Sequence, residues 1–162
     1  MTRVFVAAGS NVEPLVNLRL ALRELKRHYP AMRISAAYRN KAVGFEGDDF
    51  VNLVVGFETD DHVQQVIAHL HEAEVVCGRP RDAPKWAPRT MDLDLLIFGD
   101  MQCLEPGLKL PRPDLLKRPY MLRPMTELAP NFRHPTANKT MREIWQAFDS
   151  AGHIMEPVAL RI

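Results

Sequence analysis

The sequence contains few cysteines, no long hydrophobic run and no excess of either charge. Its two cysteines, Cys77 and Cys103, lie far apart and lack the spacing of metal-binding pairs, so we expect neither a disulfide framework nor a zinc site. No apolar stretch has the length of a membrane span, and no secretory signal pattern is visible. The formal net charge of +1 provides no global field that would attract nucleic acid or a membrane surface. We therefore expect a cytoplasmic monomer with reduced thiols and with neither nucleic-acid nor membrane partners.

The composition is that of an ordinary globular protein. Of its 162 residues, 46% are hydrophobic and 25% are charged, so the chain can bury a core, and we predict a single domain over residues 1–162. Prolines outnumber glycines, 13 to 8, and most of them follow residue 79. We expect the second half of the chain to be rich in loops.

Hydrophobic periodicity predicts alternating strands and helices. The predicted elements, in chain order, are a strand over residues 4–8, a helix over 15–29, strands over 32–39 and 50–58, a helix capped by Asp60-Asp61 and ending near Gly78, and a strand over 91–98. This β-α-β-β-α-β order favours a ferredoxin-like α+β sandwich, in which two helices cover one face of an antiparallel sheet. A C-terminal extension from Leu108 adds a proline-bounded turn and one or two helices, the clearest over residues 140–148.

Two aspartates interrupt the apolar character of the last predicted strand. Side chains alternate along a strand, so Asp92 and Asp94 share one face, about 7 Å apart, while Leu93 and Leu95 share the other. An unpaired carboxylate on a packed sheet costs free energy unless a cation neutralises it. Acids that keep an edge strand soluble are one explanation. The other is Mg²⁺, which prefers one or two carboxylates together with water and substrate phosphates.

The segment before this strand carries the opposite charge. Arg79, Arg81, Lys85 and Arg89 all lie in the proline-rich stretch that leads into it. Arginine presents a planar fork for bidentate phosphate contacts, so these cations, together with a metal ion, could stabilise charge during phosphoryl transfer. A solvated basic loop that pairs loosely with nearby acids is the alternative explanation.

Five sequence blocks carry a family resemblance. They are FVAAGSN at residues 5–11, DFVN at 49–52, GRPR at 78–81, WAPRTMDLD at 86–94 and RPYMLRPMTELAP at 118–130. In this order, the blocks resemble the 6-hydroxymethyl-7,8-dihydropterin pyrophosphokinases of the folate pathway. The resemblance covers nearly the whole chain, and WAPRTMDLD is its most specific block.

The resemblance implies an activity and a set of residue roles. The activity is transfer of a pyrophosphoryl group from ATP to the hydroxymethyl oxygen of the pterin, with attack at the β-phosphorus and release of AMP. Two Mg²⁺ ions held by Asp92 and Asp94 would bridge the ATP phosphates. The implied roles are catalysis for Arg79, Arg89, Asp92 and Asp94, pterin binding for Gly9, Asn40, Val43, Phe50, Asn52 and Tyr120, and nucleotide binding for Glu74, Arg81, Trp86, Arg112 and Arg118. The rings of Phe50 and Tyr120 would sandwich the pterin, although core packing is the commoner fate of an aromatic residue.

The sequence departs from the family pattern at three places. Pro111-Arg112 stands where the family usually has a Pro-His pair that contacts ATP phosphate, and arginine brings a permanent charge to that position. Asn40-Lys41-Ala42 replaces a more rigid segment at the pterin edge, and Ala87 replaces a glycine. These changes leave room for a divergent paralogue that acts on another pterin, or for a pterin-binding protein without turnover.

An RNA-binding module is the rival from another class. RNA-recognition domains share the β-α-β-β-α-β order and use sheet aromatics with basic loops. Against this rival, Asp92 and Asp94 would repel a phosphate backbone, and the net charge is close to zero. None of the six histidines forms a ligand set by spacing alone, and we assign none to catalysis.

Overall fold

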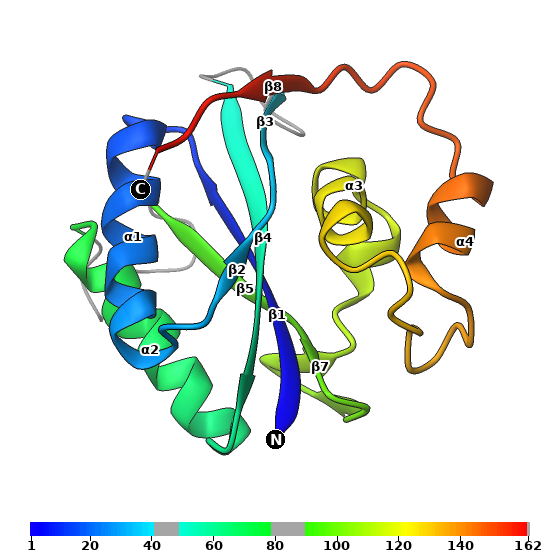
Figure 1. Cartoon of the computed structure of the whole chain (residues 1–162), viewed down its shortest axis with the longest axis horizontal. Coiled ribbons are helices and arrows are strands. Elements are labelled where there is room, and N and C mark those ends of the chain that lie inside the picture. Colours follow the sequence, from blue (N-terminus) through cyan, green and yellow to red (C-terminus); the bar gives the residue numbers. More distant parts are fainter. Residues whose placement is uncertain (41–48, 79–89, 162) are drawn as a thin grey trace.

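The computed structural model describes residues 1–40, 49–78 and 90–161. Its centre is an antiparallel sheet with the strand order β5-β1-β4-β3-β8 (Figure 1). The strands are β1 (Thr2–Ser10), β3 (Ala37–Asn40), β4 (Phe50–Thr59), β5 (Asp92–Phe98) and β8 (Glu156–Val158), and β2 (Arg33–Ile34) pairs with β4 off this path. The mixed helix and antiparallel-sheet class predicted from the sequence is confirmed.

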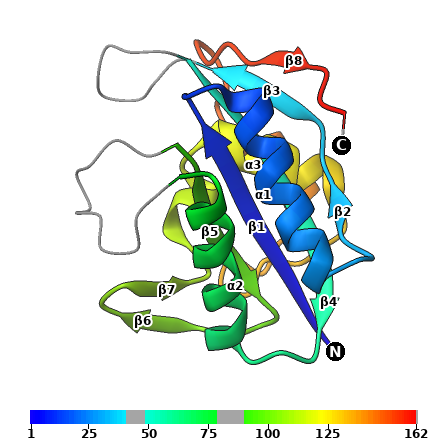
Figure 2. The same ribbon diagram turned by 90° about the vertical axis from the view of Figure 1, so that its left-hand side faces the viewer.

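Two amphipathic helices cover one face of the sheet (Figure 2). Helix α1 (Pro14–His28) buries Leu18, Leu22 and Leu25, because leucines at steps of three and four fall on one side of a helix. Helix α2 (Val63–Val76) runs beside it and ends before Gly78, whose φ of 93° suits glycine after a helix end. Both helices pack on the alternate positions of β1 and β4 that face them, which form one hydrophobic core.

The C-terminal half covers the opposite face. Helix α3 (Pro119–Leu128) and helix α4 (Met141–Ala147) lie on the far side of the sheet from α1 and α2 (Figure 1). They bury Phe5, Val54 and Ile97 in a second core. Between β5 and α3 the chain forms a hairpin of β6 (Cys103–Glu105) and β7 (Leu108–Leu110), followed by a short 3-10 helix, η1 (Pro113–Leu116). The sequence predicted one or two helices here, but neither the hairpin nor the second core.

Strand β5 turns one face toward α3. A β-bulge in the strand lies between the polar end and the packed end of this face. Val6 of β1 pairs with Leu95, but Phe5 pairs with Ile97, so Leu96 is an extra residue in β5. Leu96 and Ile97 consequently both pack against the α3 side, and Phe98 returns to the α1 side. Strict alternation would place Ile97 on the wrong face.

Two boundary predictions are corrected by the structure. The strand predicted over residues 32–39 is broken into β2 and β3, because the Ser35 hydroxyl, in place of a backbone carbonyl, accepts the Val54 N–H at 2.9 Å. The α2 cap is His62, whose backbone N–H donates to the Gln65 side chain at 2.8 Å, and not Asp60-Asp61. Asp61 instead accepts a hydrogen bond from Tyr29 at 3.0 Å. Within the described residues, no helix has the length and hydrophobicity needed to cross a bilayer.

Candidate active site

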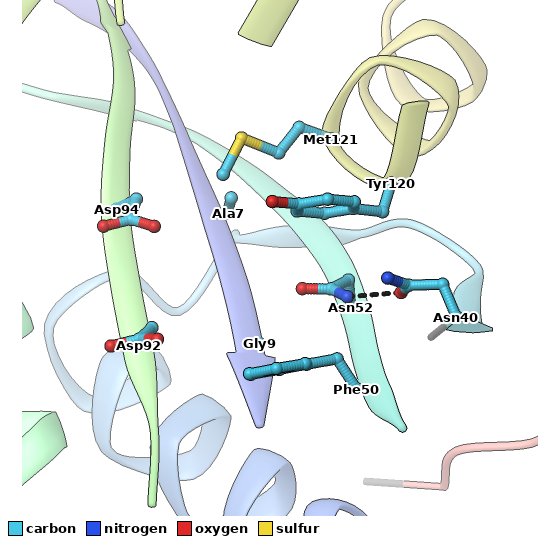
Figure 3. A pocket seen from close by; sticks show the side chains of 9 residues that line it. All are labelled: Ala7, Gly9, Asn40, Phe50, Asn52, Asp92, Asp94, Tyr120 and Met121. Carbon is cyan, nitrogen blue, oxygen red and sulfur yellow. Dashed lines mark hydrogen bonds between the residues drawn. The ribbon is translucent and has the colours of Figure 1, made fainter. Parts of the chain in front are cut away.

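A pocket forms where the α3-side face of the sheet extends past helix α3. On this face, the positions of β1, β4 and β5 beyond the buried core are occupied by small or polar residues. Gly9 lies in register with both Asn52 and Asp92, and Ala7 lies opposite Asp94. The pocket has a volume of about 210 Å³ and is lined by Ala7, Gly9, Asn40, Phe50, Asn52, Asp92, Asp94, Tyr120 and Met121 (Figure 3). All the predicted pterin and metal residues that the structure describes therefore meet in one place.

The floor of the pocket is set by one close backbone contact and one amide pair. A Cβ atom on Gly9 would overlap the side-chain oxygen of Asn52, so only glycine allows Asn52 its position. The Asn52 Nδ2 donates to Asn40 Oδ1 at 2.6 Å, which holds the two amides in one orientation. The carbonyl end of Asn52 then faces the pocket (Figure 3). Such an edge can select a flat heterocycle by hydrogen bonding.

Two aromatic rings form the opposite walls. Phe50 begins β4, and Tyr120 lies in the first turn of α3, so the rings reach the pocket from different layers of the fold (Figure 3). Both side chains are only partly buried, in contrast to core aromatics such as Phe5. Burial is the main reason that the pKa of Tyr120 is raised, and its hydroxyl therefore stays neutral at pH 7. Tyr120 also packs against the second core, whereas Phe50 belongs to neither core cluster of the described residues.

Asp92 and Asp94 point to the same side of β5, as the alternation predicted (Figure 3). The N–H of Leu93, which lies between them, donates to the buried carboxylate of Glu74 at 3.1 Å, so α2 fixes the backbone that carries both acids. Two half-buried carboxylates side by side at a pocket rim match the ligand preference of Mg²⁺. The donor set thus fits a magnesium site.

A second, larger cavity adjoins the first at Asp94. It has a volume of about 710 Å³ and lies between α2, β5 and the β7–η1 segment. One wall is apolar, from Ile67, Leu70 and Leu108. The rest of the lining is charged, with the cations Lys109, Arg112 and Lys117 and the acids Glu74, Asp94 and Asp114. An apolar wall beside cations suits a ligand with a flat base and an anionic tail.

The other predicted site residues divide into three groups. Glu74 and Arg112 line the larger cavity. Arg118 precedes α3 as its N-cap and lines neither cavity. The remaining predicted site residues, Val43, Arg79, Arg81, Trp86 and Arg89, lie outside the described residues.

Sequence reasoning missed several residues of the two cavities. Ala7 and Met121 complete the smaller one, and His71, Lys109 and Lys117 lie in the larger one. Ala7 could have been found, because it precedes Gly9 by two positions on the same strand face. The cations could not, since single lysines in a loop-rich segment carry no pattern.

Among the described residues, neither cysteine lines these two cavities, and His71 lines the larger one. Burial raises the pKa of Cys77 to about 11, so its thiol is not activated. At the surface between α1 and α2, ligand atoms of Glu24, His28 and Glu72 lie within 4.8 Å of one another, a grouping that the sequence spacing did not predict. Glu24 is also paired with Arg27 at 3.0 Å, and the group belongs to the helix-covered side of the sheet.

A sequence model of the 7,8-dihydro-6-hydroxymethylpterin-pyrophosphokinase (HPPK) family matches residues 5–130. The chain belongs to this family. It is 33% identical over 145 residues to the 2-amino-4-hydroxy-6-hydroxymethyldihydropteridine pyrophosphokinase of Aquifex aeolicus, covering 88% of this chain and 90% of that protein. The enzyme of the same name from Pseudomonas aeruginosa is 36% identical over 138 residues, covering 82% and 84%. The family resemblance drawn from the five sequence blocks is confirmed.

Solved structures of the HPPK family share the fold. A structure of an HPPK-DHPS protein in complex with substrates matches 90% of this chain with a TM-score of 0.72 and 11% identity, and a Plasmodium falciparum HPPK-DHPS with pteroate matches 90% with a TM-score of 0.70 and 14% identity. This chain spans 42% of each of those chains. It therefore corresponds to less than half of those proteins.

Proposed function

We propose that this protein transfers the pyrophosphoryl group of ATP to the hydroxymethyl oxygen of 6-hydroxymethyl-7,8-dihydropterin, releasing AMP, as a step of folate biosynthesis. The observation that carries the proposal is the meeting of two cavities at Asp94. One has aromatic walls and an amide edge, and the other has an apolar wall and cations. Two substrates bound in these cavities would approach each other beside the aspartate pair.

The smaller cavity binds the pterin. Its ring stacks between Phe50 and Tyr120, while Asn40 and Asn52 offer hydrogen bonds to its polar edge. Val43 contributes to the same site. Holding the ring between two walls directs its hydroxymethyl group to the aspartate side, which orients the nucleophile.

Asp92 and Asp94 would hold two Mg²⁺ ions, and the bound ions would neutralise phosphate charge and favour loss of the hydroxyl proton. The protein's own part is to fix the two carboxylates on a strand whose backbone is anchored by Glu74. A rigid anchor keeps both acids at the junction of the cavities. The pterin oxygen then forms its bond to the β-phosphorus while the bond from that phosphorus to the bridging oxygen of AMP breaks.

The larger cavity binds ATP. Arg112, Lys109 and Lys117 contact the anionic tail, and the apolar wall formed by Ile67 and Leu108 covers the base. Arg79, Arg81, Trp86, Arg89 and Arg118 complete the nucleotide and catalytic groups of the proposal. We further assign the core to the ferredoxin-like sandwich, which the order β5-β1-β4-β3 of its central strands supports.

Product analysis tests this function directly. The protein incubated with ATP, Mg²⁺ and 6-hydroxymethyl-7,8-dihydropterin is expected to form AMP and the pterin pyrophosphate in equal amounts, measured by chromatography. ADP as the nucleotide product would contradict pyrophosphoryl transfer. Asp94→Asn is expected to lower kcat by about a hundredfold or more, because a carboxylate ligand is lost. Asp100→Asn, an exposed acid just beyond β5, is the matched control and should leave kcat unchanged.

A further inference from the structure

Arg112 contacts the aspartate that is proposed to bind metal. Its Nη2 lies 3.5 Å from Asp94 Oδ1, and on its other side its Nε lies 3.6 Å from Asp114 Oδ2. The Arg112 and Asp94 side chains are 37% and 25% exposed, so water only partly screens the pair. The same guanidinium lines the larger cavity, which places one cation between a metal ligand and the nucleotide site.

The guanidinium is held loosely in this position. Both ion-pair distances exceed the 2.7–2.9 Å typical of a charge-assisted hydrogen bond. Among the described residues, the buried Arg112 Nε makes no hydrogen bond, which costs free energy for a charged donor. The backbone is fixed, because the Arg112 N–H donates to the Leu96 carbonyl at 2.9 Å. The side chain can therefore change partner while its Cα stays in place.

We propose that Arg112 exchanges between Asp94 and the nucleotide phosphates, so that nucleotide binding removes a competing positive charge from Asp94 and strengthens metal binding there. The proposal rests on the proposed function, because it takes Asp94 as a metal ligand. A phosphate oxygen offers the guanidinium the short bidentate contact that Asp94 does not provide here. A histidine, expected at this position from the family pattern, would not carry a permanent charge to Asp94.

The exchange couples the two ligands. While Arg112 pairs with Asp94, a divalent cation must displace a positive charge, so the free protein binds metal weakly. A nucleotide that draws Arg112 away raises metal affinity, and by linkage the metal raises nucleotide affinity by the same factor. For a partly exposed pair acting on a divalent ion, we expect a factor of about three to ten.

Metal binding to the nucleotide-free protein tests the exchange without measuring turnover. In Mn²⁺ titrations followed by electron paramagnetic resonance, Arg112→Met should bind Mn²⁺ about three to ten times more tightly than the parent protein. Arg112→Lys should restore affinity close to that of the parent. Lys117→Met is the matched control, because it removes a cation from the same cavity wall, and it should change the Mn²⁺ affinity less than twofold.

A second measurement follows ATP binding in EDTA by calorimetry. Asp94→Asn should tighten ATP binding more in the parent protein than in the Arg112→Met background, because only the parent has the arginine to release. Equal effects in both backgrounds, or an unchanged Mn²⁺ affinity in Arg112→Met, would overturn the exchange. If Asp94→Asn binds Mn²⁺ as the parent does, it is the metal assignment of the proposed function that fails.

Discussion

Tyr120 serves the pocket while it packs, only partly buried, against the second core. It lies in the first turn of α3, and its ring forms one wall of the pocket, while the next two residues of that helix, Met121 and Leu122, are buried. Stacking on an aromatic ring contributes roughly 0.5–1.5 kcal/mol beyond the area that it buries. A substitution that keeps apolar bulk but removes the ring should therefore measure stacking alone.

We expect Tyr120→Leu to raise the pterin Kd by about two- to tenfold. Tyr120→Phe keeps the ring and should leave the Kd within about twofold, because the hydroxyl is neutral and stacking is unchanged. Fluorescence titration with the pterin gives both values. Equal weakening by the two substitutions would show that the hydroxyl, and not the ring, binds the ligand.

His134 is a residue whose burial makes stability depend on pH. It is 2% exposed, and its Nδ1 accepts the Ala137 N–H at 3.1 Å. Burial lowers the pKa of the folded-state imidazole below its ordinary value of 6.5, so the unfolded chain binds a proton at higher pH than the folded protein does. The free energy of unfolding should then rise with pH through the window just below 6.5 and become flat above it.

The substitution His134→Asn separates this contribution from that of the other histidines. Its side-chain oxygen can still accept the backbone N–H groups of the turn, but it does not titrate. Urea unfolding between about pH 5 and pH 8 should show a smaller loss of stability on acidification than in the parent protein. Parallel curves for the two proteins would remove His134 as the cause.

At the scale of elements, α3 connects the second core to the site. Its buried side includes Leu122 at 0% exposed, in the cluster that also contains Phe5 and Ile97. The same helix carries Tyr120 and Met121 to the pocket. Packing of α3 on β4 therefore sets the position of one pocket wall.

We expect Leu122→Ala to lower the free energy of unfolding by about 2–5 kcal/mol, because it leaves a cavity between α3 and the sheet. The matched control is Leu104→Ala in β6, where the leucine is 85% exposed and the change should stay within about 0.5 kcal/mol. Urea denaturation measures both. Similar effects at the two positions would contradict the assignment of α3 to a packed second core.

At the scale of the whole molecule, the C-terminal segment reaches back to the edge of the sheet next to the pocket. Strand β8 pairs with β3, with Arg39 opposite Glu156, and the next residue of β3 is Asn40. Leu160 packs against the α1-side core, and the Arg161 carbonyl accepts a hydrogen bond from Arg19 at 2.8 Å. The C-terminal segment, distant in sequence from the pocket residues, thus supports the strand that carries Asn40 of the pocket floor.

Deleting residues 150–162 should raise the KM for the pterin several-fold while leaving kcat nearly unchanged. The reason is that β3 loses its outer partner strand, so Asn40 is held less firmly. The aspartates lie in β5, at the opposite edge of the sheet, and should keep their positions. Steady-state kinetics with saturating ATP separates the two parameters. An unchanged KM would show that β8 supports only the stability of the fold.

Much of the fold could be predicted because the decisive patterns are local. The leucine spacing of α1 and the alternation that puts Asp92 and Asp94 on one face depend only on helix and strand geometry. The five sequence blocks carried the family, which the comparisons confirm. The roles of the individual site residues and the single domain over residues 1–162 stay predictions.

Only the tertiary structure decided features that depend on contacts between distant segments. The extra residue Leu96, the second core under α3 and the pairing of Arg112 with Asp94 all need a partner that sequence spacing does not identify. The cap of α2 moved to His62 for the same reason, since Asp61 binds Tyr29. By itself, the sequence determined which faces are apolar and which residue types could bind phosphate and metal, because periodicity and side-chain chemistry are local. Where those residues meet was decided by packing, which is a property of the whole chain.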